Sequence, residues 1–277
     1  MRIGIIQTKQ NKLYDFNDIN FYITKEKAKK LQHEMIQQNF KLIDEACNLN
    51  CDLIVTSEAI DFCRTSSKID GIIPELFPNP NDELFIKLSE YAKKANSYLI
   101  AGVYNRPFDN NKIYNSAYIY NRNGELIDVY DKIHLAGIEN DTLVCGNKYV
   151  VISMEFGNVG VCICWDMQFP EVSRELVLGG ADLIICLTWG WEQIYGHARA
   201  YENGVFVASS MSVPYNGIID GIRNPSEVIS PEGKVLARAC NNEAQILTCD
   251  INLKNCLPYK ELRMSNRHSS TYKNICK

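Results

Sequence analysis

The sequence predicts an α/β protein in which mixed sheets are covered by helices. Helical patterns alternate with short apolar runs, as in residues 2–56, where a strand, a helix and a second strand follow one another. Elsewhere, alternating runs flank Asn123-Gly124 and Pro231-Glu232-Gly233, and such turns are typical of antiparallel hairpins. Crossovers and hairpins in one chain favour mixed sheets over a purely parallel sheet.

The first half of the chain is expected to supply five strands and two helices. A helix over residues 25–48 has apolar side chains on one face and charged side chains between them. Residues 61–81 are polar and interrupted by prolines, so we expect a loop that covers one end of the sheet. The second helix is expected over residues 82–95, and the strands over 2–7, 51–56, 98–104, 113–120 and 125–130.

The second half repeats this mixture of elements. Pro170 favours the start of a helix and Gly179 its end, so a helix is expected over residues 170–178. The chain beyond Asn255 is polar and is expected to wrap a neighbouring subunit or the domain itself. No repeat or linker interrupts the sequence, which predicts one domain over residues 1–277. A further helix is expected over 192–202, and strands over 149–153, 159–164, 181–187, 205–210, 226–230, 234–237 and 245–251.

The composition is that of an ordinary globular protein and argues against two classes of partner. Of 277 residues, 46% are hydrophobic and 22% are charged, which is enough for a sizeable core. A formal net charge of -4 argues against nucleic acid or an anionic membrane as the main partner. Gln7 interrupts the first apolar run, and no run is long enough to cross a bilayer, so the expected compartment is the cytoplasm.

The chain has eleven cysteines, an odd number that argues against a disulfide framework. Most lie in apolar runs, as Cys162, Cys186 and Cys249 do, and in a reducing compartment they are expected to be small buried hydrophobes. A metal site built from Cys145, Cys162, Cys164 and Cys186 is a poor prediction. Positions 162 and 164 are expected on the same face of a strand, but no second close pair completes a tetrahedral set.

The stretch from Gly160 to Glu171 organises the rest of the sequence. An apolar run with strand character ends at Cys164, and Pro170-Glu171 follows as the first turn of a helix. A cysteine at such a junction can present its thiol to a cleft. Backbone N–H groups at a helix start favour negative charge, so the thiol is expected to ionise more easily than usual. Cys164 is therefore a candidate nucleophile.

Two charged residues stand at the expected ends of other strands. Glu58 follows the strand over residues 51–56, and Lys132 follows the strand over residues 125–130. A carboxylate can take the proton of a thiol when burial raises its pKa, and an ammonium can stabilise a tetrahedral oxyanion. Considered alone, Glu58 and Lys132 are more often solvated surface residues, and Cys164 is more often an inert core thiol than a nucleophile. Composition and periodicity therefore leave the question open.

The segments around Glu58, Lys132 and Cys164 resemble the three motifs of the nitrilase superfamily, the carbon–nitrogen hydrolases, and they stand in the family's order. Two later segments also resemble the family. The resemblance covers nearly the whole chain and includes the opening residues 2–7. Single motifs of this kind are weak, whereas several in order are specific. The blocks are Ile54-Val55-Thr56-Ser57-Glu58, Tyr130-Asp131-Lys132-Ile133-His134-Leu135, Ile163–Glu171, Ala198–Val207 and Ser226–Ala237.

The resemblance implies a four-layer α-β-β-α sandwich with two mixed sheets, assembled as a homodimer or a larger homo-oligomer. It also implies a Glu58-Lys132-Cys164 triad. The family often has a second glutamate seven residues before a glycine, and Glu139 and Gly146 have that spacing. The implied reaction is hydrolysis of a small amide through a cysteine thioester, with no metal or organic cofactor. Lys132 and the backbone N–H of Trp165 would stabilise the oxyanion.

The sequence departs from the family pattern at positions that bear on the substrate. Many amidases and carbamoylases have arginine four positions after the nucleophile, where this chain has Gln168, so a substrate carboxylate is less expected there. Many members have Asn-Pro after the following strand, where this chain has Thr188-Trp189-Gly190-Trp191. Trp189 and Trp191 are candidates for the substrate-pocket wall, and core or interface packing is the alternative. Gln168 is also a candidate substrate-binding residue.

Several readings of the function stay open at this point. Amide hydrolysis leads, followed by hydrolysis of N-carbamoyl amines or N-carbamoyl amino acids and then by nitrile hydrolysis. Histidine-assisted thiol chemistry fits less well, because only His134 of the four histidines lies in a motif. A catalytically retired relative that acts as a binding protein is the alternative from another class.

Overall fold

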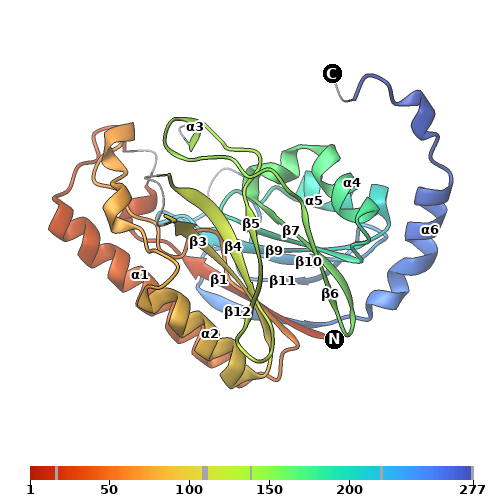
Figure 1. The fold of residues 1–277 in the computed structure, drawn as a ribbon, viewed down its shortest axis with the longest axis horizontal. Helices are drawn as coiled ribbons and strands as arrows, with labels where there is room; N and C mark the ends of the chain where they lie inside the picture. The colour runs from red at the N-terminus through yellow and green to blue at the C-terminus, as the bar shows by residue number, and fades with distance from the viewer. Residues whose placement is uncertain (16–17, 108–111, 138, 219–220, 276–277) are drawn as a thin grey trace.

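The structure is a computed structural model that describes residues 1–15, 18–107, 112–137, 139–218 and 221–275. In these residues twelve strands form one mixed sheet, whose main path runs β5-β4-β3-β2-β1-β9-β8-β7-β6 (Figure 1). The two ends of the path, β5 and β6, contact each other. No helix in the described ranges is long and apolar enough to cross a membrane.

The N-terminal half of the chain forms one half of the sheet. β1, β2 and β3 are parallel, and β3, β4 and β5 are antiparallel, as the Asn123-Gly124 turn predicts. Gly124 has a φ of 80°, a conformation that favours glycine at this turn. The elements are β1 (Arg2–Lys9), α1 (Lys25–Ala46), β2 (Leu53–Val55), α2 (Glu83–Ala95), β3 (Tyr98–Asn105), β4 (Tyr114–Tyr120) and β5 (Leu126–Asp131).

The C-terminal half forms the other half of the sheet in a similar way, except that the last strand, β12, pairs antiparallel with β1. β7, β8 and β9 are parallel, whereas β6 pairs antiparallel with β7, and β10 pairs antiparallel with β9 and β11. The elements are α3 (Glu139–Thr142), β6 (Val150–Met154), β7 (Gly157–Ile163), α4 (Pro170–Leu178), β8 (Leu183–Thr188), α5 (Gln193–Asn203), β9 (Phe206–Val213), β10 (Glu227–Ile229), β11 (Val235–Arg238), β12 (Gln245–Asp250) and α6 (Leu257–Ser265).

The halves join where β1 meets β9, through the pairs Thr8–Ser212 and Lys9–Val213. The α/β class and the mixed strand order are confirmed. The predicted division into two separate sheets is not confirmed, because the pairing of β1 with β9 makes the strand path continuous. The inner core nevertheless contains side chains from both halves, such as Ile5 and Ile163.

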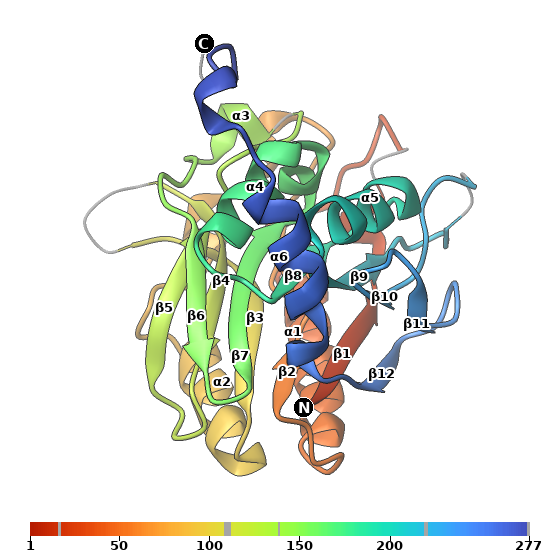
Figure 2. The ribbon, with the colours of Figure 1, turned by 90° about the vertical axis from the view of Figure 1, so that its right-hand side faces the viewer.

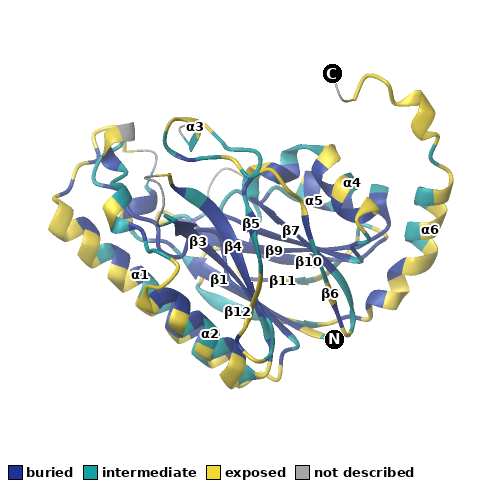
Figure 3. Cartoon of the chain, in the orientation of Figure 1, coloured by how far each residue is buried: buried dark blue, intermediate teal, exposed yellow. Residues whose placement is uncertain are grey.

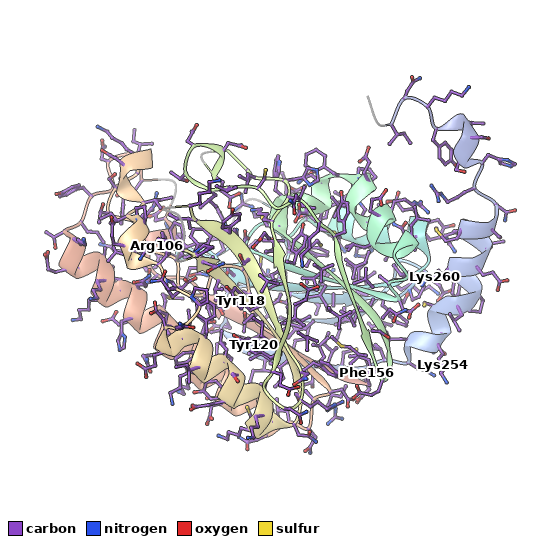
Figure 4. The ribbon with its side chains drawn as sticks, viewed as in Figure 1. Arg106, Tyr118, Tyr120, Phe156, Lys254 and Lys260 are labelled. Atoms are coloured by element: carbon purple, nitrogen blue, oxygen red, sulfur yellow. The ribbon has the colours of Figure 1, made fainter. Side chains whose placement is uncertain are left out.

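The helices cover the outer faces of the two halves. α1 and α2 pack on β1–β4 through a second apolar cluster, and α4 and α5 pack on β7–β9 through a third. Tyr118 and Tyr120 lie on the α2 side of β4, where Tyr118 packs on the ring of Phe85 and Tyr120 reaches its carbonyl (Figure 4). Figure 3 shows the strands largely buried, while exposed residues lie along the outer sides of α1 and α2.

The sequence did not reveal the last helix. α6 begins at Leu257 and lies on the same side as α5, where Figure 2 shows it crossing in front of the strands. Lys260 Nζ donates to Asp182 Oδ1 at 2.8 Å, and the Arg263 guanidinium stacks on the Tyr201 ring. The first part of the polar C-terminal segment, α6, therefore packs on its own domain.

Candidate active site

Glu58, Lys132 and Glu139 form a buried cluster of charges. Glu58 follows the end of β2, Lys132 follows β5, and Glu139 is the first residue of α3. Lys132 Nζ lies 3.0 Å from Glu58 Oε1 and 2.8 Å from Glu139 Oε2. Asn115 of β4 donates to Glu58 Oε1 at 2.8 Å, so a fourth buried side chain fixes the cluster. We call these four residues the charged wall.

Backbone packing holds the glutamate in place. A Cβ on Gly102 of β3 would lie 2.5 Å from the Ser57 carbonyl oxygen and 2.9 Å from Glu58 Cα, so only glycine fits there. Ala59, the next residue after Glu58, has a φ of 49°, which is uncommon for a residue with a side chain. The chain therefore turns sharply just after the carboxylate, and the β3 backbone supports this turn.

Burial and pairing set the protonation of the charged wall. Burial raises the pKa of Glu58, and the charge of Lys132 offsets part of this increase. Burial by itself lowers the pKa of Lys132, but the neighbouring acidic groups, Glu58 first, raise it well above its ordinary value. Lys132 is therefore a permanent cation. In the described part of the chain, Glu58 Oε2 is buried and accepts no hydrogen bond. This oxygen is available for a proton.

Cys164 stands directly after β7 in an unusual backbone conformation. It is the first residue of the 3₁₀ helix η4 (Cys164–Gln168) and has a φ of 47°. Asp166 fixes this turn, because its buried Oδ2 accepts from the Ile163 N–H at 2.9 Å and from the Tyr130 hydroxyl at 2.6 Å. Its other oxygen accepts from the His134 N–H at 2.9 Å. Asp166 thereby ties the cysteine turn to the Lys132 segment.

Two expectations about the cysteines are wrong. Cys162 and Cys164 do not share a face. Cys162 lies in the core under α4 and α5, whereas the left-handed turn directs Cys164 toward the inner core. The thiol of Cys164 also does not ionise more easily than usual. Burial raises its pKa, Glu58 raises it further, and Lys132 offsets only part of this effect. The resting group is a thiol that needs a base.

Glu139 joins the cluster through a short connected segment. The Ala136 N–H donates to Glu139 Oε2 at 2.7 Å, and the Gly146 N–H donates to the Lys132 carbonyl at 2.8 Å. A Cβ on Gly146 would collide with the backbone of Asp131. The segment after Lys132 therefore turns back so that the Glu139 carboxylate contacts Lys132. Seven residues later, Gly146 packs against the backbone at the end of β5.

Two cavities meet at Cys164, and Ala136 and Trp189 line both of them. The first has a volume of about 250 Å³, and we call it the aromatic cavity. Its apolar side chains are Tyr14, Phe62, Ile72, Tyr104 and Trp189, and its polar or charged side chains are Arg64, Ser66, Lys68, Lys132 and Glu139. The second has a volume of about 160 Å³ and is lined by Trp165, Gln168, Glu192, Tyr195 and Arg223 in addition to the shared residues; we call it the polar cavity.

The predicted substrate-binding residues have different locations. Trp189 lines both cavities and Gln168 the polar cavity. Trp191 lines neither, because it is fully buried and its indole N–H donates to Glu227 Oε2 at 2.9 Å, so its predicted place in the pocket wall is corrected to core packing. The ring of Trp165 is 42% exposed at the polar cavity. Its N–H belongs to the first turn of η4, where a helix leaves N–H groups without intrahelical acceptors.

The sequence did not identify several residues of the site. Asn115, Tyr14, Phe62 and Tyr104 lie in ordinary strand or loop patterns, and only the fold brings them to Cys164. Arg223 stacks over the Trp189 ring at 5.9 Å from a distant segment, again without a local signal. The described residues contain no group of three or more histidine, cysteine, aspartate or glutamate side chains arranged to hold a metal ion.

Comparisons with known proteins show the family to which the chain belongs. The family model described as carbon-nitrogen hydrolase matches residues 4–261. Omega-amidase NIT2 of Xenopus tropicalis is 28% identical over 258 residues, which cover 86% of this chain and 91% of that protein. The hydrolase in the agr operon of Staphylococcus aureus is 31% identical over 221 residues, which cover 74% of this chain and 80% of that protein.

Solved structures share the fold over almost the entire chain. A carbon-nitrogen hydrolase from Helicobacter pylori has a TM-score of 0.79 and 20% identity, with 100% of this chain and 98% of that one covered. An amidase from Nesterenkonia sp. has a TM-score of 0.75 and 21% identity, with 99% and 95% covered. At these identities the likeness concerns the fold.

Proposed function

The chain belongs to the carbon–nitrogen hydrolases of the nitrilase superfamily, and on that premise we propose that it cleaves the C–N bond of a small amide. The products are an acid and either ammonia or an amine. The observation that carries this proposal is the state of Glu58, whose Oε1 is held by Lys132 and Asn115 while Oε2 is buried without a hydrogen-bond partner among the described residues. A carboxylate in this state can move a proton and keep its position.

The proposed reaction begins with the thiol of Cys164. Glu58 takes the thiol proton, and the sulfur attacks the carbonyl carbon. Lys132 and the Trp165 N–H stabilise the oxyanion, and Glu139 positions the substrate beside Lys132. Glu58 then gives its proton to the leaving nitrogen, which leaves a thioester on Cys164. Water activated by Glu58 hydrolyses the thioester. The raised pKa of Cys164 means that its thiol needs a base, and the raised pKa of Glu58 makes the Glu58 carboxylate a stronger acceptor for that proton.

The relatives support amide hydrolysis and leave the substrate to be determined. Omega-amidases and an amidase are among the similar proteins, which favours amides over nitriles. Hydrolysis of an N-carbamoyl amine or N-carbamoyl amino acid is the second candidate, because the Cys164-Trp165-Asp166 motif resembles that of some carbamoyl-amine hydrolases. Ammonia and amine release measured across short amides, N-carbamoyl amines and nitriles distinguishes these substrate classes.

Replacement of the nucleophile tests the proposal. Cys164→Ala is expected to abolish turnover and to keep the native unfolding transition. An electrophilic amide analogue is expected to add its mass to Cys164 in the wild-type protein and not in Cys164→Ala. An active Cys164→Ala protein would exclude the scheme. A wild-type thiol that stays unlabelled would favour a catalytically retired binding protein.

Several broader expectations remain part of the proposal. We expect one domain over residues 1–277, a four-layer arrangement of the two half-sheets and their helices, a homodimer or larger homo-oligomer, and location in the cytoplasm. Limited proteolysis tests the single domain, sedimentation tests the oligomer, and cell fractionation tests the location.

A further inference from the structure

The two cavities give a substrate two directions in which to extend from the reacting carbon. Both reach Cys164, and Trp189 stands between them as a shared wall. An amide carbonyl at the sulfur has a carbon substituent on one side and nitrogen on the other. Each cavity can therefore receive only one side of the substrate, and the placement of the catalytic groups decides which.

The charged wall assigns the nitrogen to the aromatic cavity. Lys132 and Glu139 line the aromatic cavity and not the polar one, and Lys132 is bonded to Glu58. In the proposed reaction the leaving nitrogen takes its proton from Glu58, so it must face this wall. A substituent on the nitrogen then continues into the aromatic cavity, while the acyl group lies on the side of Gln168 and Glu192.

The size of the aromatic cavity indicates a large substituent. A molecule the size of water or ammonia needs only about 10–15 Å³ of such volume, and an apolar cavity of about 150 Å³ holds benzene. The aromatic cavity measures about 250 Å³. Its rings form a continuous wall, with centroid distances of 4.4 Å for Tyr14–Phe62, 5.6 Å for Phe62–Tyr104 and 6.0 Å for Tyr14–Trp189. On this side of the cavity a second ring can pack edge to face or offset against the wall.

We propose that the substrate is an N-substituted amide whose nitrogen carries an aryl or branched alkyl group of about benzyl size, bound in the aromatic cavity. This inference rests on the proposed amide hydrolysis and specifies the leaving group. The C–N bond breaks, and the nitrogen takes the proton that Glu58 received from Cys164. Water then adds hydroxide to the thioester carbon, the C–S bond breaks, and the proton from water returns through Glu58 to the Cys164 sulfur. The products are a carboxylic acid and a primary amine, and water is the only co-reactant.

An isomeric pair of amides tests the assignment. N-Benzylacetamide carries its phenyl group on the nitrogen, and 3-phenylpropanamide carries it on the acyl side, with the same atoms in both. The kcat/KM of the wild-type protein is expected to be at least roughly tenfold higher for N-benzylacetamide, the factor that burial of an apolar group typically gives. Benzylamine and ammonia release are measured separately, with acetamide as the unsubstituted reference.

Two phenylalanine variants test whether the preference for N-benzylacetamide arises in the aromatic cavity. Phe62→Leu removes one ring from the aromatic cavity and is expected to reduce the ratio of the two kcat/KM values roughly two- to tenfold. Phe85→Leu makes the same change in the cluster under α2, away from both cavities, and is expected to keep the wild-type ratio. The ratio is insensitive to a general loss of active protein, so partial misfolding of either variant does not imitate the effect.

Each contrary result has a distinct meaning. A preference for 3-phenylpropanamide, or hydrolysis of acetamide without any gain from the benzyl group, overturns the assignment of the aromatic cavity and leaves amide hydrolysis standing. An equal fall in the ratio for both phenylalanine variants also overturns it. Failure to hydrolyse all three amides, together with an unlabelled Cys164, overturns the proposed function and this inference with it.

Discussion

The two sides of Cys164 are built differently. On the charged wall, Glu58 and Lys132 are almost fully buried, at 0% and 1% exposure, and they are joined at 3.0 Å. On the side of the polar cavity, Gln168 and Glu192 are partly exposed and make one long contact, 3.4 Å from Nε2 to Oε1. The comparison indicates that the reacting groups are fixed before substrate arrives, while the polar cavity tolerates changes of side chain.

Removal of the central cation has the largest expected effect. Lys132→Met leaves Glu58 and Glu139 close together without their shared cation, so the free energy of unfolding should fall by roughly 3–5 kcal/mol. Loss of an oxyanion partner should lower kcat by a factor of about 10²–10³. Urea unfolding and steady-state amide hydrolysis measure the two effects. Lys87→Met breaks an exposed ion pair with Glu90 instead and should leave the free energy of unfolding nearly unchanged, because solvent screens such a pair. Equal stability of the two variants would contradict the difference between a buried and an exposed pair.

Asp61 shows what burial does to a carboxyl group that forms no ion pair with any described residue. The Tyr104 N–H donates to its Oδ1 at 2.8 Å, and burial raises its pKa from 3.8 to about 7. A pKa raised by folding means that stability is complete below pH 3.8 and falls as the pH rises to about 7. The shift corresponds to roughly 4 kcal/mol. Asp61→Asn removes this titration, so its stability relative to wild type should increase from pH 4 to pH 7 and level off above. Thermal unfolding across this range measures it, and a constant difference would show that Asp61 keeps an ordinary pKa.

Alanine substitutions at two glycines test how tightly the backbone packs beside the charged wall and beside the polar cavity. Gly102→Ala forces a Cβ against the Ser57 carbonyl and Glu58 Cα and should cost roughly 1–3 kcal/mol of stability, with a loss of activity as Glu58 moves. A Cβ on Gly190 would meet only Cys164 Sγ, at 3.8 Å, which is ordinary contact. Gly190→Ala should therefore change the unfolding free energy by less than about 0.5 kcal/mol. Equal costs in chemical denaturation would mean that the charged wall is no tighter than the loop after β8.

The smallest effect is expected at Gln168. Gln168→Ala removes a partly exposed amide and its long contact with Glu192, so stability should change by less than about 0.5 kcal/mol. Hydrolysis of acetamide should persist, with a change in kcat/KM that depends on the acyl group and is measured across a series of acyl chains. Complete loss of activity would mean that Gln168 is as necessary for the reaction as the residues of the charged wall.

Local sequence patterns predicted most elements because they report local physical constraints. Pro170 and Gly179 gave the bounds of α4, and Asn123-Gly124 gave the hairpin between β4 and β5. The helix α6 was missed because its residues are largely polar, and contacts such as Lys260 with Asp182 hold it in place. The motif resemblance selected Glu58, Lys132, Cys164 and Glu139, and the fold brings the three charged residues within ion-pair distance and Cys164 into the same cavity as two of them.

The sequence by itself determined which residue types stand at the strand ends and in what order. The tertiary structure alone decided four further properties. It joined the half-sheets through β1 and β9, turned Cys164 away from Cys162 by a positive φ, and raised the thiol pKa by burial. It also brought Tyr14, Phe62 and Tyr104 together into one cavity. Burial and cavity shape arise from segments far apart in the chain, so no local pattern of residues can encode them.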